Sequence, residues 1–151
     1  RKPAAGFSLN SPAGQQANFR SEAAKVIVLV TDAPFHQYYI IPGATPATYA
    51  QAAAALQALP RAQVLGIFSN PDYPSYITDL ENVARDTGSL APPGGVDCTG
   101  DGAPDILEGD PLVCTVNYTG AGIPEAFIAL VETVTDCRTY LPLLQRVPSA
   151  P

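Results

Sequence analysis

The chain has 151 residues and a net charge of −6, with 8 lysines and arginines against 14 aspartates and glutamates. This acidic balance argues against nucleic acid and anionic membranes as partners, and it favours cations or basic protein surfaces. Hydrophobic residues make up 46% of the sequence, so we expect a folded domain with its own core. No apolar run approaches the roughly 20 residues of a membrane-spanning helix, so we expect no membrane insertion.

The N-terminal segment, residues 1–20, has scattered Pro, Gly, Ser and Gln without a period, and we interpret it as an irregular arm. Lys25–Thr31 is a continuous apolar run rich in β-branched residues. A run without alternation predicts a strand that is buried on both faces of a parallel sheet. After a loop, Thr45 and Pro46 suit the cap and first turn of a helix that continues to Leu59.

Strand and helix patterns alternate along the rest of the chain. The expected elements are a buried strand at 63–69, a helix at 76–87, a short strand at 89–91, an extended segment at 112–118 and a helix from Ile123 to about Thr133. This order predicts an α/β fold over residues 21–135, with a mostly parallel sheet between two layers of helices. We interpret the Pro-rich residues 136–151 as a tail.

The chain contains three cysteines, so one thiol is left over if two of them pair. Cys98 and Cys114 flank an acidic loop, and we expect a disulfide between them that closes about 15 residues. Cys137 is then free or bonded to another polypeptide. Asn117 begins an Asn-Tyr-Thr sequon and is the candidate glycosylation site. These features and the low charge predict a secreted or cell-surface protein.

The segment from Asp97 to Glu108 matches the EF-hand calcium loop position by position. Its candidate Ca²⁺ ligands are Asp97, Thr99, Asp101, Asp105, Glu108 and the backbone carbonyl of Ala103. Because Ca²⁺ takes 6–8 oxygen ligands, this spacing predicts a single calcium loop inserted at residues 97–110. Thr99 is a weaker ligand than Asp, and no amphipathic helices flank the loop. The alternative is an acidic, glycine-rich surface turn.

Other candidate residues carry weaker signals. Asp32 directly follows the first predicted strand, at the end where open α/β sheets bind ligands, although a turn cap explains its position equally simply. His36 is the only histidine, and we interpret it as a packing or hydrogen-bonding residue. The aromatic and aliphatic residues 38–41 suit either loop packing or a contact patch. No hydrolase or phosphate-loop motif is present, and we expect no enzymatic activity.

Several of these segments resemble one known family. An aromatic–Arg pair at residues 19–20 precedes the apolar run, the run ends in Thr31, Asp32 and Ala33, and His36 follows. This order resembles the fourth strand of integrin β I-like domains and their bacterial relatives. Residues 49–59, 64–68, 79–88 and 122–131 resemble the elements that follow in that family. The chain, over about residues 19–133, thus resembles the C-terminal half of a von Willebrand factor A domain.

The resemblance implies half of a Rossmann-like fold and an adhesion site in which Asp32 contacts Mg²⁺ through water. The Asp-x-Ser-x-Ser loop that supplies most ligands in the family does not occur here. We therefore expect Mg²⁺ only where the missing half of the site is present. The expected function is metal-dependent adhesion or protein binding outside the cell. The alternative is a structural subunit of an extracellular filament or surface assembly, stabilised by Ca²⁺ and contacts between chains.

The resemblance also implies a partner. In the family the strands lie in the order 3-2-1-4-5-6, so Lys25–Thr31 would lie at the inner edge of a three-stranded slab. An apolar edge strand exposes unpaired backbone groups and is rarely left bare. We expect it to pair with the missing N-terminal half, with another copy of this chain in an oligomer or filament, or with the arm at 1–20.

Overall fold

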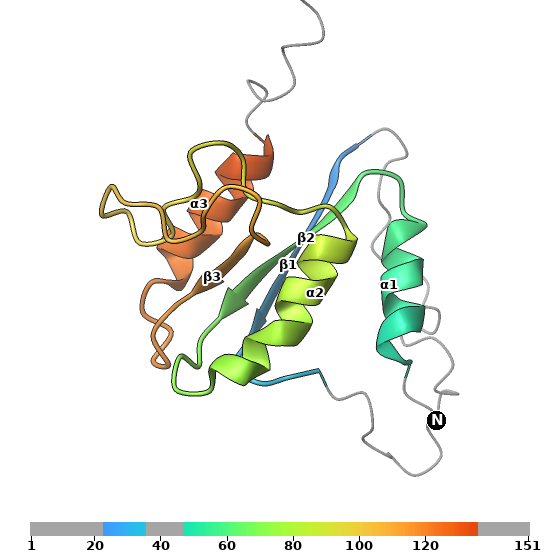
Figure 1. Ribbon diagram of the computed structural model, residues 1–151, viewed down its shortest axis with the longest axis horizontal. Coiled ribbons are helices and arrows are strands. Elements are labelled where there is room, and N and C mark those ends of the chain that lie inside the picture. The colour runs from blue at the N-terminus through green and yellow to red at the C-terminus, as the bar shows by residue number, and fades with distance from the viewer. Residues whose placement is uncertain (1–22, 36–46, 136–151) are drawn as a thin grey trace, which may run out of the picture.

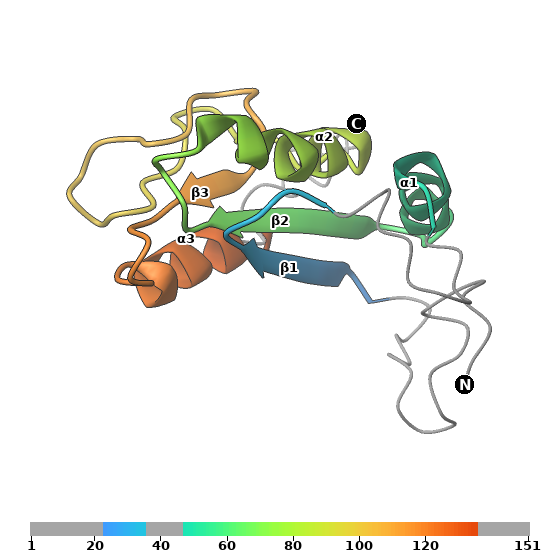
Figure 2. The same cartoon turned by 90° about the horizontal axis from the view of Figure 1, so that it is seen from below.

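The computed structural model describes residues 23–35 and 47–135, which form a sheet with helices on both faces (Figure 1). In chain order the elements are β1 (Lys25–Thr31), α1 (Tyr49–Gln57), β2 (Ala62–Phe68), the 3-10 helix η1 (Pro74–Ile77), α2 (Thr78–Asp86), β3 (Val113–Thr115) and α3 (Ile123–Thr135). Helices α1 and α2 lie on one side of the sheet and α3 on the other (Figure 2). The predicted α/β class, with a parallel sheet between helices, is confirmed in this coarse form.

The sheet has the order β1-β2-β3, and both neighbouring pairs are parallel. β1 pairs with β2 along its whole length, from Lys25 opposite Ala62 to Thr31 opposite Phe68. β3 is shorter and pairs only with the last three residues of β2. Its register begins with Val113 opposite Gly66. β2 is therefore the central strand, and the first half of its β3-facing edge has no strand beside it in the described residues.

The third strand does not lie where the sequence placed a short strand. Residues 89–91 form only an isolated antiparallel bridge, between Leu90 and Pro111, and the expected strand there is wrong. Gly88 turns the chain with a φ of 70°, and Ala91 then exchanges backbone hydrogen bonds with the 109–110 turn. This antiparallel contact keeps the segment out of the parallel sheet. β3 lies instead within the expected extended segment at 112–118.

The core is centred on β2 and not on β1. Leu65 and Ile67 of β2 are fully buried in a cluster with α3, and Phe68 is buried against α2 on the opposite face. β1 has an equally apolar sequence, yet Val30 is 51% exposed and the residues from 26 to 29 are only half-buried. The difference follows from position, because β2 has a neighbouring strand on each side, whereas β1 has one within residues 23–35 and 47–135.

Helix α1 is joined to α2 by side-chain hydrogen bonds. The Tyr49 hydroxyl donates to the Asp86 carboxylate over 2.6 Å, and Gln57 Nε2 donates to the Asp86 carbonyl over 3.0 Å. Burial, and then the bond to Asp86, raises the pKa of the Tyr49 hydroxyl above its ordinary value. The helix begins after Thr48, whose hydroxyl and the Gln51 side chain form a reciprocal capping box.

Some predictions fall outside the described residues. They are the arm at 1–20, His36, the cluster at 38–41, Cys137 and the tail at 136–151. The expected helix start at Thr45 and Pro46 is wrong, because Thr48 is the N-cap and the helix runs from Tyr49 to Gln57. Within the described ranges, no helix is long and apolar enough to cross a membrane.

Candidate functional site

All three strands end at one edge of the sheet, because they are parallel. Asp32 follows β1 there and is exposed. Its backbone carbonyl accepts a 3.0 Å hydrogen bond from Asn70 Nδ2, which ties it to the loop that leaves β2. The turn after β1 is held by Thr31, whose hydroxyl accepts from the Ala33 N–H and donates to the Ala33 carbonyl. Within the described residues, the side-chain hydrogen bonds of this turn come from Thr31 and not from the Asp32 carboxylate.

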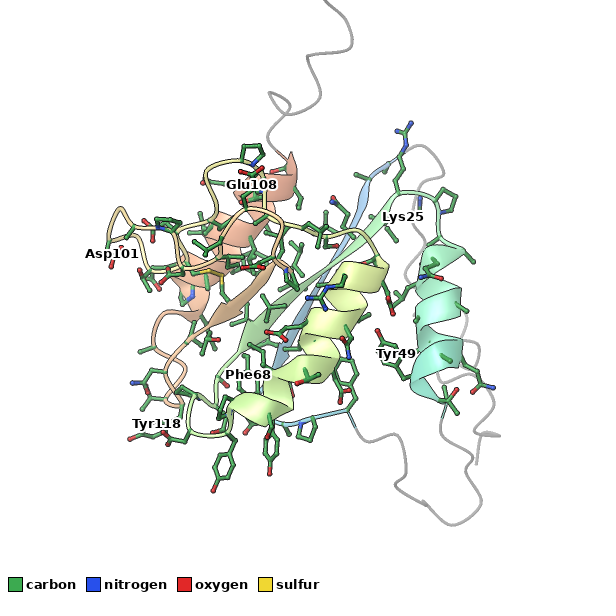
Figure 3. All side chains as sticks on the ribbon, viewed as in Figure 1. Lys25, Tyr49, Phe68, Asp101, Glu108 and Tyr118 are labelled. Carbon is green, nitrogen blue, oxygen red and sulfur yellow. A yellow bond between two sulfur atoms is a disulfide. The ribbon has the colours of Figure 1, made fainter. Side chains whose placement is uncertain are left out.

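A groove of about 530 Å³ opens at the same edge, between the 97–105 loop, the end of β3 and the start of α3. Polar side chains on its walls are Thr99, Thr115, Asn117 and Glu125. The loops that leave β2 and β3 here also carry Tyr73, which is 54% exposed, and Tyr118, which is 71% exposed. Figure 3 shows Tyr118 directed away from the sheet. Exposed tyrosines beside a polar groove suit the recognition of a protein surface better than that of a small buried ligand.

The predicted calcium segment forms a compact loop closed by an antiparallel bridge between Val96 and Ile106. Asp97 accepts hydrogen bonds from the backbone N–H groups of Thr99, Gly100 and Gly102, at 3.1, 2.6 and 2.7 Å. These bonds, that from Gly102 most of all, hold the pKa of the Asp97 carboxyl below its ordinary value. The ionised form of Asp97 is therefore the one that these three backbone N–H groups stabilise.

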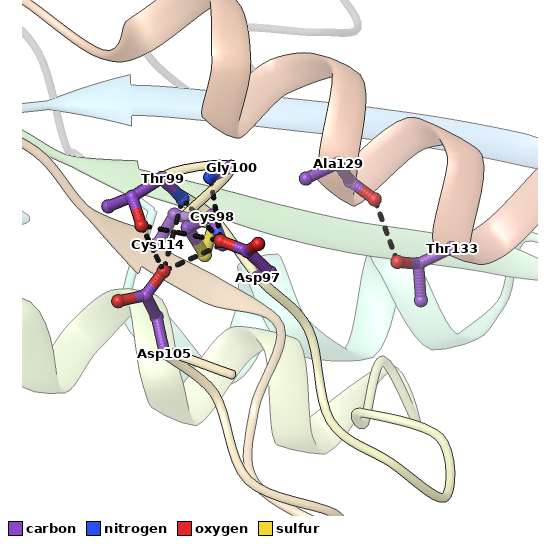
Figure 4. Close-up of a disulfide and its surroundings, with 8 residues drawn as sticks. All are labelled: Asp97, Cys98, Thr99, Gly100, Asp105, Cys114, Ala129 and Thr133. Atoms are coloured by element: carbon purple, nitrogen blue, oxygen red, sulfur yellow. Dashed lines mark hydrogen bonds between the residues drawn. A yellow bond between two sulfur atoms is a disulfide. The ribbon is translucent and has the colours of Figure 1, made fainter. Parts of the chain in front are cut away.

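Asp105 lies beside Asp97 in this loop. Its carboxylate accepts from the backbone N–H groups of Cys98 and Thr99, at 2.8 and 3.1 Å. The Thr99 N–H and hydroxyl lie within bonding distance of both carboxylates, so the three side chains meet at one point (Figure 4). Asp97, Thr99 and Asp105, at loop positions 1, 3 and 9, are thus brought together.

The other expected calcium ligands are not gathered at this point. Asp101 accepts from the Ala103 N–H over 2.9 Å at the tip of the loop, and Figure 3 shows Glu108 well apart from Asp101. Among the described residues, no group of three or more Asp, Glu, His or Cys side chains is close enough together to hold a metal ion. To gather the whole expected set at one point, Asp101 and Glu108 would have to move inwards.

A disulfide joins the loop to the sheet. The Sγ atoms of Cys98 and Cys114, the expected pair, lie 1.99 Å apart, and both residues are buried (Figure 4). Cys114 is the middle residue of β3, so the bond fixes one end of the acidic loop against the core. The loop and the groove wall beside it are therefore attached to the sheet covalently.

Asn117, the candidate glycosylation residue, is exposed just after β3. Its side-chain oxygen accepts a 2.9 Å bond from the Thr119 N–H, which forms a turn. Sequence reasoning did not identify Glu125, Tyr73 or Tyr118 as residues of this edge. The rule that ligands bind at the carboxyl ends of parallel strands would have pointed to the loops that contain them.

Comparison of the chain with protein-family models, with curated proteins and with solved structures finds no significant match.

Proposed function

We propose that this chain is an extracellular, non-catalytic protein-binding domain of von Willebrand A type, which receives a strand from a partner along β1. The observation that carries the proposal is the unpartnered edge of β1. In the described residues this strand pairs only with β2, and its five central residues are all apolar. Addition of a strand to such an edge is a common mode of protein recognition, because the main-chain hydrogen bonds supply affinity.

The sheet order supports the assignment to this fold type. A C-terminal half of a von Willebrand A domain would contribute its fourth, fifth and sixth strands as adjacent parallel strands. The order β1-β2-β3, with α1 and α2 connecting parallel neighbours on one face, is compatible with that arrangement. The disulfide and the exposed sequon support an extracellular location.

Asp32 is the proposed residue of an adhesion site, and it requires ligands that this chain does not supply. The test is to express the chain together with any upstream half that contains an Asp-x-Ser-x-Ser loop and to measure Mg²⁺ binding by calorimetry. We expect Asp32→Ala to weaken Mg²⁺ binding and to leave the two halves associated. Asp72→Ala, in an exposed loop after β2, is the matched control. Equal Mg²⁺ affinity in the two variants would remove Asp32 from the proposal.

We also propose that the 97–108 loop binds one Ca²⁺, with Asp97, Thr99 and Asp105 as its preformed side and Asp101, Glu108 and the Ala103 carbonyl closing on the ion. Binding to the folded state alone raises its stability by mass action. We expect a higher melting temperature with Ca²⁺ than with a chelator, and a smaller difference in Glu108→Gln. Glu132→Gln, in α3, is the control. An unchanged melting temperature in Ca²⁺ would reject this part of the proposal.

The alternative function is a structural subunit of an extracellular filament or surface assembly. The same free edge favours it, because an edge strand can pair copies of one chain as well as two different chains. Native mass determination distinguishes the two functions. A defined complex with a different polypeptide supports binding, whereas a polymer of this chain alone supports assembly.

A further inference from the structure

The hydrogen bonds of β1 show which of its residues face the free edge. The Lys25 N–H donates to the Arg61 carbonyl, and the Thr31 carbonyl accepts from the Ser69 N–H. In a parallel pair, alternate residues direct both backbone groups to the same neighbour. The even residues Val26, Val28 and Val30 therefore turn their N–H and C=O groups away from β2. Each of them presents one donor and one acceptor at the edge.

The central residues of β1 are not of the types that prevent edge pairing. Proteins block edge strands with charges, prolines or bulges, and residues 26–30 contain only Val, Ile and Leu. Lys25, at the start of the strand, does not serve this purpose because it is 4% exposed. Its ammonium group donates instead to the carbonyls of Pro60, at 2.9 Å, and Ala23, at 3.3 Å.

We propose that β1 pairs with β1 of a second copy of this chain, antiparallel and centred on Val28. This inference rests on the proposed function, since it names a second copy as the partner of the same edge when no N-terminal half occupies it. A two-fold axis through Val28 makes the two edges identical and self-complementary. The result is a continuous sheet of the order β3-β2-β1-β1′-β2′-β3′.

The side chains of β1 match this register. Val28 lies opposite its own copy and Val26 opposite Val30 of the second chain, so Val30, half-exposed in one chain, becomes covered. On the other face, Ile27 lies opposite Leu29. Every cross-strand pair in the centre of the ladder is then apolar, which is the pairing that stabilises antiparallel strands.

The geometry of the edge selects the antiparallel direction. In a parallel pair, a residue whose N–H and C=O groups point to the neighbouring strand lies opposite a residue whose groups point away, as Lys25 and Ala62 do. The two-fold axis places the outward groups of Val26, Val28 and Val30 against the same groups of the second chain, and directly opposite residues exchange both hydrogen bonds only in an antiparallel ladder.

The segment that precedes β1 is a poorer match than a second copy of β1. Residues 1–22, which precede β1, contain no Val, Ile or Thr and include two prolines. Such a segment is a weak strand former and cannot supply a complete ladder of donors. β1 itself has the apolar, uncharged character that the edge requires.

The test is native mass spectrometry of the full chain over a dilution series. We expect a species with twice the 15.7 kDa of one chain. Val30→Lys adds a charge at the edge and should raise the concentration needed for association by about tenfold or more. Ile128→Lys makes the same change on α3 at a similarly exposed position, 55% against 51%, and should leave association unchanged.

A second variant and amide exchange distinguish loss of the dimer from loss of the folded monomer. Val28→Pro removes an N–H that β2 does not use, so the monomer should keep its circular dichroism while the dimer is lost. The amides of Val26, Val28 and Val30 should exchange slowly in the dimer and quickly on dilution, whereas that of Leu29, bonded to β2, stays slow.

The results that would contradict self-pairing of β1 also distinguish it from the proposed function. A monomer whose three outward amides exchange quickly at every concentration overturns self-pairing and leaves the edge available to another polypeptide. A monomer in which these amides are slow means that the chain covers its own edge, which overturns both proposals. Equal effects of Val30→Lys and Ile128→Lys would also overturn self-pairing.

Discussion

Ser89 supplies a hydrogen-bond partner to a part of β2 that the short strand β3 does not reach. The Val64 N–H points to the side of β2 where β3 has not yet begun, so it has no strand partner in the described part of the chain. The fully buried Ser89 hydroxyl accepts this N–H over 2.9 Å, and the Thr87 hydroxyl lies at 3.2 Å from the same nitrogen. In the described residues, no buried side-chain nitrogen or oxygen lacks a partner. These two hydroxyls therefore complete the edge of β2 in place of a strand.

Replacement of Ser89 by alanine should destabilise the fold. Loss of a buried hydrogen-bond partner costs about 1–3 kcal/mol, and we expect about 1 kcal/mol here because Thr87 can still accept the Val64 N–H. Urea unfolding of Ser89→Ala measures the change. Ser75→Ala, at an exposed position in η1, is the control and should be neutral. Identical unfolding midpoints for the two variants would contradict this role of Ser89.

Asp97 gives the acidic loop a dependence on pH. Its pKa is lowered in the folded state, so its contribution to stability is present above the unfolded pKa of about 3.9 and is lost as the pH falls through the folded pKa. Asp97→Asn cannot accept all three backbone N–H groups and should lower the melting temperature at pH 7. The difference from wild type should shrink below about pH 4. A difference that is constant across this pH range would show that ionisation of Asp97 is not responsible.

Residues 87–112 are the longest stretch of the described chain without a helix or strand, and a few contacts hold this segment in place. These are the Cys98–Cys114 disulfide, the Val96–Ile106 bridge and the bonds between Ala91 and the 109–110 turn. Because Val96, Cys98 and Ile106 are buried in the same cluster as α3, the loop is part of the core. The groove at the carboxyl edge therefore has a fixed wall on this side.

The disulfide should contribute substantially to stability. In the chain-entropy model, closing a loop of about 15 residues is worth about 3 kcal/mol. We expect the double variant Cys98→Ala with Cys114→Ala to lose about this amount in thermal unfolding, while Cys137→Ala changes little. Peptide mapping without reduction checks the pairing directly. Recovery of Cys98 as an alkylated free thiol from native protein would contradict it.

The residues of β2 are buried more completely than those of β1. β2 receives side chains from α3 on one face and from α2 on the other, and Leu65 is 0% exposed. β1 is covered on both faces only in part, although its residues are as apolar as those of β2. Among the described residues, the core is therefore closed around β2 and only partly covered at β1.

The stability lost when single leucines are replaced by alanine should follow this difference in burial. We expect Leu65→Ala to cost about 2–5 kcal/mol, as large-to-small changes in a packed core do. Leu107→Ala, at a position that is 62% exposed, should stay within about 0.5 kcal/mol. Leu29→Ala in β1 should fall between them in the isolated chain. A cost for Leu29→Ala as large as that for Leu65→Ala would show that β1 is fully covered in solution.

The sequence by itself determined the class of fold and most of its elements. β1 was predicted at its observed bounds, because a continuous run of β-branched residues has few other stable conformations. The bounds of β2 differ by one residue, and those of α3 by about two at its end. The disulfide pair followed from the two cysteines that flank one loop. These features are local, and the chemistry of a few neighbouring residues decides them.

Only the tertiary structure decided the third strand and the arrangement of the acidic loop. Residues 89–91 and 113–115 are both short and apolar, and the choice between them depends on which can lie parallel to β2 after the turn at Gly88. Asp97, Thr99 and Asp105 meet because backbone N–H groups hold the two carboxylates in place, whereas Asp101 and Glu108, equally acidic in sequence, lie apart. The exposure of β1 likewise follows from its place at the edge of the sheet. The residues of β1 are typical of a central strand. The position of a strand in the sheet is set by pairing between distant segments of the chain, and a local sequence pattern does not encode that pairing.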